Sequence, residues 1–206
     1  MEPQKYEPHK VGPQKCEPYE VEAKRKKTWD QEMADLFTAF GPISGPLHPS
    51  STENVQMKRE PWLFRFWDIN QNYFFLQNNI LIAAPQNSNS SDELMVVLPN
   101  HSLDRKKRPI FIGLRDKSYT LFCVKSGEGQ PQLKLEERKI RQLYEKNEEF
   151  KSFTFYSKTD GSEETCSFQS AEFPDWFIST SPEPNQPVGL SKRDGSANTL
   201  FYFEIK

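Results

Sequence analysis

Histidines and cysteines are the residues of this 206-residue chain that could support nucleophilic catalysis. A cysteine nucleophile needs a histidine base within hydrogen-bond reach, and a third polar group to orient that base. His9, His48 and His101 are scattered, and none stands at a spacing typical of a partner for Cys123 or Cys166. We therefore assign no catalytic residue and do not expect an enzyme.

Metal and phosphate chemistry also lack their usual signals. The sequence has no cysteine and histidine pattern of a zinc site and no glycine-rich phosphate loop, so we expect no metal and no cofactor. Cys16, Cys123 and Cys166 are too few for a disulfide framework, which indicates free thiols in a reducing compartment. Cys123 alternates with Leu121 in an apolar run, which predicts a buried and inert thiol.

The remaining candidates for a functional site are charged residues on a loop, which could bind a partner. Four consecutive cations stand between two apolar runs: Arg105, Lys106, Lys107 and Arg108. Together with Asp104 they form one short loop, which could steer an acidic partner surface and raise the association rate. A solvated charge run without a partner is the alternative.

The overall composition limits the class of partner. The formal net charge is -2, which argues against a general nucleic-acid surface. No run of about eighteen apolar residues is present, so we expect no membrane insertion. The first residues also lack the apolar stretch of a secretory signal.

Residues 1–59 predict a mostly disordered tail. Residues 3–12 and 13–22 are a tandem decapeptide repeat, rich in proline and charge, that cannot bury a core. A basic run follows the repeat: Lys24, Arg25, Lys26 and Lys27. It is either a nuclear-localisation signal or a solvated charge run.

The tail also contains one amphipathic helix. Thr28 and Gln31 form a capping-box pattern, and Gly41 with Pro42 ends the helix. Apolar residues recur between them at helical spacing: Trp29, Met33, Leu36, Phe37 and Phe40. A lone helix of about three turns is marginal in water, so the apolar stripe needs a partner. That partner is either the body of this protein or a separate protein.

Residues 60–206 predict a domain of short strands. Twelve candidate strands follow one another: Leu63–Ile69, Tyr73–Gln77, Leu81–Ala84, Leu94–Leu98, Ile110–Leu114, Tyr119–Lys125, Gln132–Glu136, Ser152–Ser157, Thr165–Phe168, Trp176–Thr180, Val188–Leu190 and Leu200–Ile205. A single helical turn is expected around Arg138–Tyr144. Three groups of four strands fit an all-β, pseudo-three-fold β-trefoil, whose closure removes open edges. A β-sandwich fits the strand count almost as well.

The segment Phe168–Leu190 carries the most specific pattern in the chain. Nine positions follow F-x-S-A-x-x-P-x-x-F-I-S-T-x7-V: Phe168, Ser170, Ala171, Pro174, Phe177, Ile178, Ser179, Thr180 and Val188. Because large aromatic side chains in strands are mostly buried, we expect Trp176 and Phe177 in the core. The pattern resembles the signature of the interleukin-1 cytokine family.

The resemblance extends over residues 62–206. Further segments are similar to the interleukin-36, -37 and -38 subgroup and its antagonists: Phe66–Asn70, Leu81–Pro85, Pro109–Gly113, Leu133–Glu136 and Phe153–Tyr156. The resemblance implies a β-trefoil cytokine that binds an immunoglobulin-domain interleukin-1-type receptor and a shared accessory receptor, and that modulates inflammatory signalling. Agonist-like and antagonist-like segments occur together, so both roles stay open.

The same resemblance implies a second contact loop, at residues 191–198, facing the accessory receptor. Lys192, Arg193 and Asp194 are the contact residues that it implies. The acidic determinant of the family near the end of this loop has no match, since Ala197 and Asn198 stand there. This departure keeps the antagonist alternative open.

Processing and release are implied as well. The resemblance implies a precursor that a protease trims just ahead of the first strand, around Met57, Lys58 and Arg59; Asp30 and Asp35 are caspase-type alternatives. We expect a cytoplasmic precursor, with a nuclear-acting form as an alternative, and a monomeric product secreted without a signal peptide. A trefoil lectin or protease inhibitor is the remaining alternative.

Overall fold

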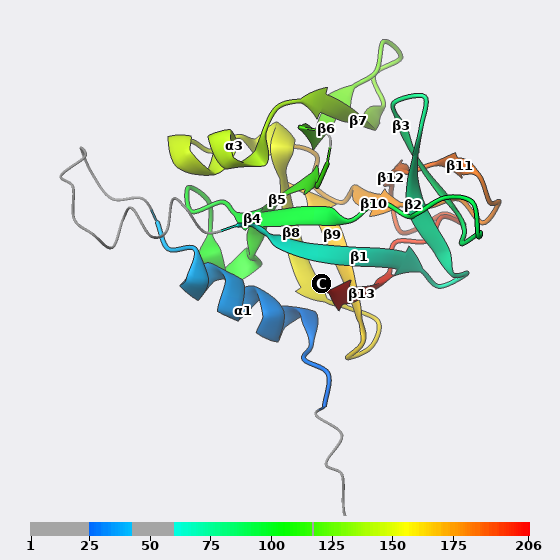
Figure 1. The fold of residues 1–206 in the computed structure, drawn as a ribbon. Helices are drawn as coiled ribbons and strands as arrows, with labels where there is room; N and C mark the ends of the chain where they lie inside the picture. Colours follow the sequence, from blue (N-terminus) through cyan, green and yellow to red (C-terminus); the bar gives the residue numbers. More distant parts are fainter. Residues whose placement is uncertain (1–24, 43–59, 117) are drawn as a thin grey trace, which may run out of the picture.

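The computed structural model describes residues 25–42, 60–116 and 118–206 (Figure 1). Its helices are α1 (Trp29–Ala39) and α3 (Ile140–Lys146), with short 3-10 turns η1 (Arg105–Lys107) and η2 (Lys151–Phe153). Its strands are β1 (Trp62–Asp68), β2 (Asn72–Gln77), β3 (Ile80–Pro85), β4 (Met95–Pro99), β5 (Pro109–Leu114), β6 (Tyr119–Lys125), β7 (Pro131–Glu137), β8 (Thr154–Thr159), β9 (Thr165–Ser170), β10 (Phe177–Ser179), β11 (Gln186–Pro187), β12 (Gly189–Ser191) and β13 (Phe201–Ile205).

Six strands close into a barrel. Each of them pairs antiparallel with two neighbours, in the ring β1, β4, β5, β8, β9, β13 and back to β1. Phe66 stands opposite Phe203 where β13 meets β1, which completes the circle. A closed ring has no open edge among its six strands, whereas a sandwich of two sheets has four. This ring confirms the predicted trefoil barrel over the sandwich alternative.

Three hairpins complete the trefoil. Each hairpin connects two successive strands of the barrel: β2–β3 connects β1 with β4, β6–β7 connects β5 with β8, and β10–β12 connects β9 with β13. This arrangement gives the pseudo-three-fold repeat. Asn78 and Asn79 turn the first hairpin with φ of 50° and 61°, the left-handed conformation that asparagine tolerates in two-residue turns. The described residues contain thirteen strands rather than the twelve expected, because the two-residue strand β11 pairs with β3.

The helix α1 packs against the barrel. Thr28 and Gln31 form the predicted capping box, with reciprocal side-chain to backbone hydrogen bonds of 3.3 and 2.9 Å. All five residues of the apolar stripe are buried, with at most 3% of any side chain exposed. Figure 1 shows α1 on the side of the barrel away from the β2–β3 hairpin. The partner of the stripe is therefore the body of this protein.

Trp29 fills the barrel end beneath α1. Its ring centroid lies 5.1 Å from those of Phe64 and Phe203, 5.7 Å from Phe66 and 5.4 Å from Phe168. The four phenylalanines come from β1, β9 and β13, three strands of the closed ring. The barrel core is consequently continuous with the helix that precedes it in the chain.

One expected core residue lies at the surface instead. Trp176 is half-buried and precedes β10, whereas Phe177 is 8% exposed and belongs to the core. The expectation that both rings are buried was wrong for Trp176, because the strand begins one residue later and Asp175, with φ of 69°, turns the backbone before it.

Candidate functional site

The first predicted contact loop has a defined conformation. Asp104 caps η1 by accepting a 3.0 Å hydrogen bond from the Lys106 N–H. Arg108 follows in the left-handed conformation, with φ of 47°, and its carbonyl accepts hydrogen bonds from the N–H and hydroxyl of Ser157. These contacts fasten the loop to β8, so its exposed cations Arg105, Lys106 and Lys107 project from a fixed backbone.

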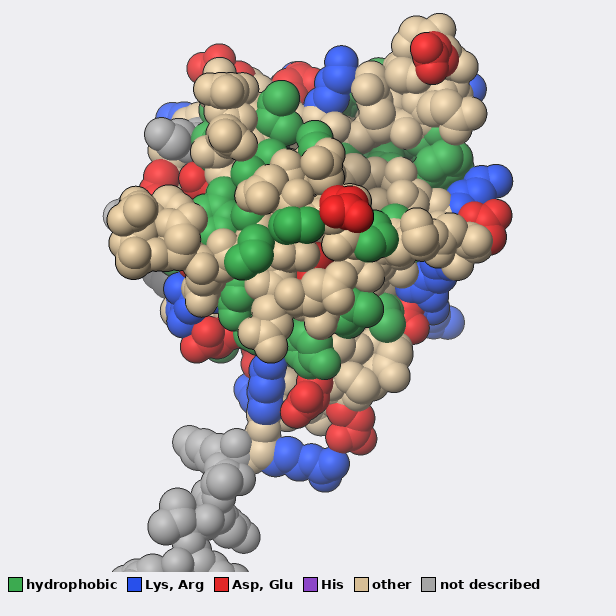
Figure 2. Space-filling model, turned by 90° about the vertical axis from the view of Figure 1, so that its right-hand side faces the viewer, with side chains coloured by type: hydrophobic (Ala, Val, Ile, Leu, Met, Phe, Trp, Pro, Cys, Tyr) green, Lys and Arg blue, Asp and Glu red, His purple; other side chains and the backbone are tan. Residues whose placement is uncertain are grey.

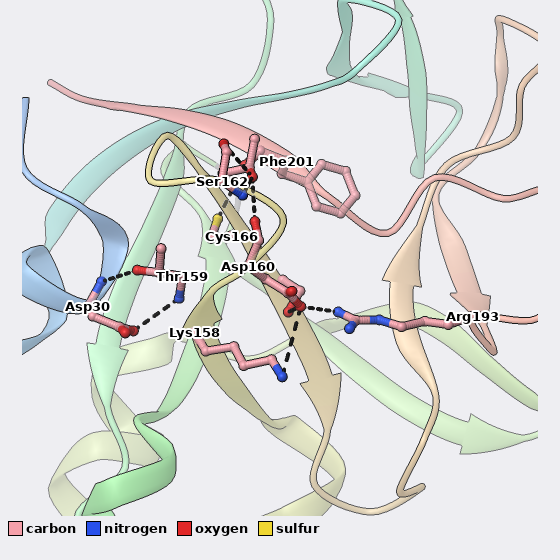
Figure 3. Close-up of polar contacts among 10 residues, drawn as sticks. Asp30, Lys158, Thr159, Asp160, Ser162, Cys166, Arg193 and Phe201 are labelled. Carbon is pink, nitrogen blue, oxygen red and sulfur yellow. Dashed lines mark hydrogen bonds and ion pairs between the residues drawn. The ribbon is translucent and has the colours of Figure 1, made fainter.

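The second predicted contact loop is fastened to the same part of the barrel. The Arg193 guanidinium lies 4.0 Å from the ring centroid of Phe177 and forms an ion pair with Asp160, at the end of β8 (Figure 3). The Lys192 ammonium lies 5.7 Å from the ring centroid of Trp176. Asp194 is exposed. Two of the three residues thus pack over the Trp176–Phe177 corner.

Asp160 connects this loop with the barrel. Its carboxylate accepts a 2.8 Å hydrogen bond from the Ser167 hydroxyl and lies 4.0 Å from the Lys158 ammonium, besides pairing with Arg193 (Figure 3). Burial alone would raise the pKa of Asp160, but the Arg193 and Ser167 hydrogen bonds and the nearby cations hold it below its usual value. A charged Asp160 therefore holds Arg193 in place at neutral pH.

A hollow of about 450 Å3 lies beside the first loop and is lined by residues of α1, η1, β8, β9 and β10. We call it the basic hollow, because four of its lining residues are cations: Lys106, Lys107, Arg108 and Lys158. Asp30 is the acidic residue among those that line it, and Phe177, beneath Arg193, forms its far edge. Tertiary structure thus places η1 beside a hollow with an excess of positive charge, and the Arg193–Phe177 contact brings the 191–198 loop to the edge of that hollow.

The predicted caspase-type residues both lie on α1. Asp30 accepts a 3.0 Å hydrogen bond from the Thr159 N–H, and the Asp30 N–H donates to the Thr159 hydroxyl at 3.0 Å (Figure 3). Arg108 approaches the same carboxylate at 3.9 Å. Asp35 pairs with Lys27 at 2.7 Å on the exposed face of the helix. Cleavage after either residue would require α1 to unwind.

The described part of the basic run also contacts the body. Arg25 pairs with Glu163 at 2.9 Å, and Lys26 donates to the Phe203 carbonyl while its ammonium lies 4.4 Å from that ring. Lys24 lies outside the described residues, as do Met57, Lys58 and Arg59, the remaining processing candidates, and His9, His48 and Cys16. The nuclear-localisation hypothesis stays a prediction.

The thiols and the described histidine have structural roles. Cys123 is 1% exposed, and burial raises its pKa to about 12; full burial also raises the pKa of Cys166. His101 Nε2 donates to the Phe40 carbonyl at the end of α1, and burial lowers its pKa. Among the described residues no cluster of three or more potential metal ligands occurs, and no helix there is long and apolar enough to cross a membrane.

The face that carries the β2–β3 hairpin and β11 differs from the basic hollow. Figure 2 shows mostly uncharged side chains and backbone there, with hydrophobic side chains among them, some acidic surface near the middle and most of the charged groups toward the rim. Among the described residues, Ile69, Ile80 and Ile205 are the exposed large aliphatic side chains, at 44–54% exposure. This face therefore presents no concentration of one charge sign that would steer a partner.

Sequence reasoning missed part of the hollow. Lys158, Tyr156 and Ser167 contribute to it from β8 and β9, and nothing in their spacing marked them. Asp160 with Gly161 was visible only as a turn signal, although its carboxylate holds Arg193. Pairing of β8 with β5 and β9 places these residues beside η1, which is information that no local pattern contains.

Comparison with known proteins agrees with the fold. The family model described as "Interleukin-1 / 18" matches residues 83–204. The mouse protein named "Interleukin-1 family member 10" is 40% identical over 140 residues, which span 67% of this chain and 90% of that protein. The bovine "Interleukin-1 receptor antagonist protein" is 37% identical over 76% of this chain and 86% of its own length.

A solved structure shows the same arrangement of strands. The NMR structure of "the pro-inflammatory cytokine interleukin-36alpha" superposes with a TM-score of 0.56 at 31% identity, over 69% of this chain and 92% of that one. The closed barrel, the three hairpins and the family match over more than half of the chain agree. The chain is therefore a β-trefoil cytokine and belongs to the interleukin-1 family.

Proposed function

We propose that this cytokine binds an immunoglobulin-domain interleukin-1-type receptor through the basic hollow, which accepts an acidic segment of that receptor. The observation that carries the proposal is the hollow beside η1, with four lining cations and one lining acid, at whose edge Arg193 of the 191–198 loop packs on Phe177. Membership of the family supports the class of receptor, and the geometry supports the place of contact.

The electrostatics favour this surface over the rest of the molecule. The whole chain has a formal charge of -2, so its attraction for an acidic partner must come from a local excess of cations. Lys106 and Lys107 are exposed, and the structure gives Lys106 no acidic partner among the described residues. Cations that are fixed by their backbone and left unneutralised raise the association rate of an acidic partner.

The 191–198 loop gives the proposal its second contact. Arg193 packs on Phe177 at the edge of the hollow, Lys192 packs on the neighbouring Trp176, and Asp194 is exposed on the same loop. A shared accessory receptor would therefore meet this side of a receptor-bound complex. The names of the relatives include both pro-inflammatory and antagonist proteins. A receptor antagonist is therefore the second candidate, and Ala197 with Asn198, which replace the expected acidic residue, favours it.

The family also suggests how the precursor is processed and how the cytokine leaves the cell. We propose that a protease trims the precursor near Met57–Arg59, that the cytokine is released without a signal peptide, and that it acts as a monomer outside the cell. The cytoplasmic precursor is the proposed source. A nuclear role of the basic run at Lys24–Lys27 is the alternative fate of the untrimmed chain.

Surface plasmon resonance on a panel of interleukin-1-type receptor ectodomains tests the contact. We compare the native chain, the double variant Lys106→Glu with Lys107→Glu, and the matched variant Lys134→Glu, whose exposed residue lies in β7, outside the basic hollow. The double variant should associate at least about tenfold more slowly, with a smaller salt dependence, while Lys134→Glu should change the rate less than about twofold.

Two results would contradict the proposal. Absence of binding to every receptor of the panel would exclude the function, and equal losses in the double variant and in Lys134→Glu would exclude the basic hollow as the contact. A cell reporter then separates the two roles. Added alone, an agonist activates signalling; an antagonist stays silent and reduces the response to a known agonist of the same receptor.

A further inference from the structure

We infer that α1 stays bound to the barrel after the chain is cut between α1 and β1, so that such a cut yields a two-chain cytokine and not a free barrel. The inference concerns the folded chain and is independent of any receptor. It extends the proposed trimming near Met57–Arg59, because it states what that cut would release.

The apolar contacts of α1 are those of a core element. Trp29, Met33, Leu36 and Phe40 have no exposed surface, and Phe37 has 3%. Removal of α1 would uncover the phenylalanines that surround Trp29 at the barrel end, each from a different place in β1, β9 and β13. Aromatic side chains contribute more apolar area than any others, so their exposure to water opposes release.

Polar contacts hold the first turn of the helix. The reciprocal hydrogen bonds between Asp30 and Thr159, both of 3.0 Å, join it to the end of β8 (Figure 3). Arg108 lies 3.9 Å from the same carboxylate and comes from η1 and its following loop. Two separate segments of the body therefore bind the first turn of α1.

The last turn is held in the same manner. The final carbonyls of a helix have no partner within it, and other groups must satisfy them. His101 Nε2 donates to the Phe40 carbonyl, and the Tyr144 hydroxyl donates to the Gly41 carbonyl at 2.6 Å. Phe37 and His101 also meet edge to face, with centroids 5.5 Å apart. The body thus completes both ends of α1 and its whole apolar face.

A cut in residues 43–59 removes none of these contacts. In the uncut chain, the covalent link holds α1 at an effective concentration in the millimolar range relative to its binding surface on the barrel. The cut removes this link and leaves the contacts themselves unchanged. An isolated helix of eleven residues is marginal in water, so release would also unwind it. Retention of α1 further keeps the Asp30 carboxylate in the basic hollow, so the cut by itself leaves the charge of that hollow unchanged.

The test uses the full chain with a specific protease site in place of residues 50–55. After complete cleavage, confirmed on a denaturing gel, native mass spectrometry and gel filtration measure the product. We expect one species that contains both pieces and elutes with the uncut chain. Separate elution of the N-terminal piece at micromolar concentration from a folded barrel piece would overturn the inference.

Three variants identify the contacts. In the cleaved protein, Trp29→Ala should raise the dissociation constant of the N-terminal piece at least about 100-fold, as expected for loss of a fully buried aromatic ring. Thr38→Ala, on the exposed face of α1, is the matched control and should leave it unchanged. If Trp29→Ala does not fold, Asp30→Ala should raise the constant about tenfold. Equal constants for Asp30→Ala and Thr38→Ala would also overturn the inference.

Discussion

The hydroxyl of Thr180 donates a 2.6 Å hydrogen bond to the carboxylate of Asp68, and both residues are at most 1% exposed. Asp68 also accepts from the N–H groups of Asn70 and Asn72, at 2.8 and 2.9 Å. The bond joins two segments that carried the family resemblance, Phe66–Asn70 and the end of the F-I-S-T pattern. It gives a physical reason why aspartate and threonine stand at these positions.

We predict that Asp68→Ala destabilises the fold by about 3 kcal/mol or more, because it leaves the buried Thr180 hydroxyl and the buried N–H and side-chain amide of Asn72 unpaired. Thr180→Val, which keeps the shape and removes one donor, should cost about 1–2 kcal/mol. Urea unfolding followed by tryptophan fluorescence measures both free energies. Wild-type stability in Asp68→Ala would show that water replaces the carboxylate.

The Trp176–Phe177 corner separates a surface ring from a core ring. Phe177→Ala should lower the free energy of unfolding by about 3–5 kcal/mol, since it opens a cavity beneath Arg193. Trp176→Ala should cost only about 1 kcal/mol, because the ring is half-buried and packs against the exposed Lys192 side chain. Thermal unfolding of the two variants shows which substitution lowers the stability more. A larger loss of stability in Trp176→Ala than in Phe177→Ala would contradict the placement of these rings.

We predict that the stability of the fold depends on pH through His101, which contacts the end of α1. Its pKa in the folded protein lies below the ordinary value of 6.5, because burial disfavours the imidazolium. The neutral ring therefore stabilises the fold above pH 6.5, and this contribution is lost as the pH falls through the lowered folded pKa.

We expect His101→Gln to show less loss of stability than the native chain when the pH is lowered from 7 to 5. The positive charge of Arg105 also lowers the pKa of His101 and so opposes protonation of the ring. Denaturant titrations at the two pH values provide the measurement. An identical pH response of both proteins would contradict this role of His101.

The buried thiols should resist modification. At pH 8, Cys123 and Cys166 remain protonated and inaccessible, so a maleimide should label neither in the native protein, and both once urea unfolds it. Peptide mass spectrometry assigns the label to each cysteine. Native labelling of Cys123 at a rate similar to that of free cysteine would show that β6 opens readily.

The sequence indicated most strands within one to three residues, because alternation of apolar and polar side chains is a local property. The predicted turn at Arg138–Tyr144 appears as α3, two residues further along the chain. β8 begins two residues later than predicted, since Lys151–Phe153 forms η2. The start of β10 was misjudged at Trp176, where a positive φ at Asp175 turns the chain before the strand begins.

By itself, the sequence determined the elements of this protein and its family: the capped helix with its apolar stripe, the short strands, and the spaced residues of the Phe168–Leu190 segment. Only the tertiary structure decided which surfaces those elements share. It placed Trp29 inside the barrel end, brought Lys106 into one hollow with Phe177, on which Arg193 packs, and set Asp30 of α1 in the lining of that hollow. The physical reason is that periodicity and capping act over a few residues, whereas barrel closure pairs strands that are far apart in the chain.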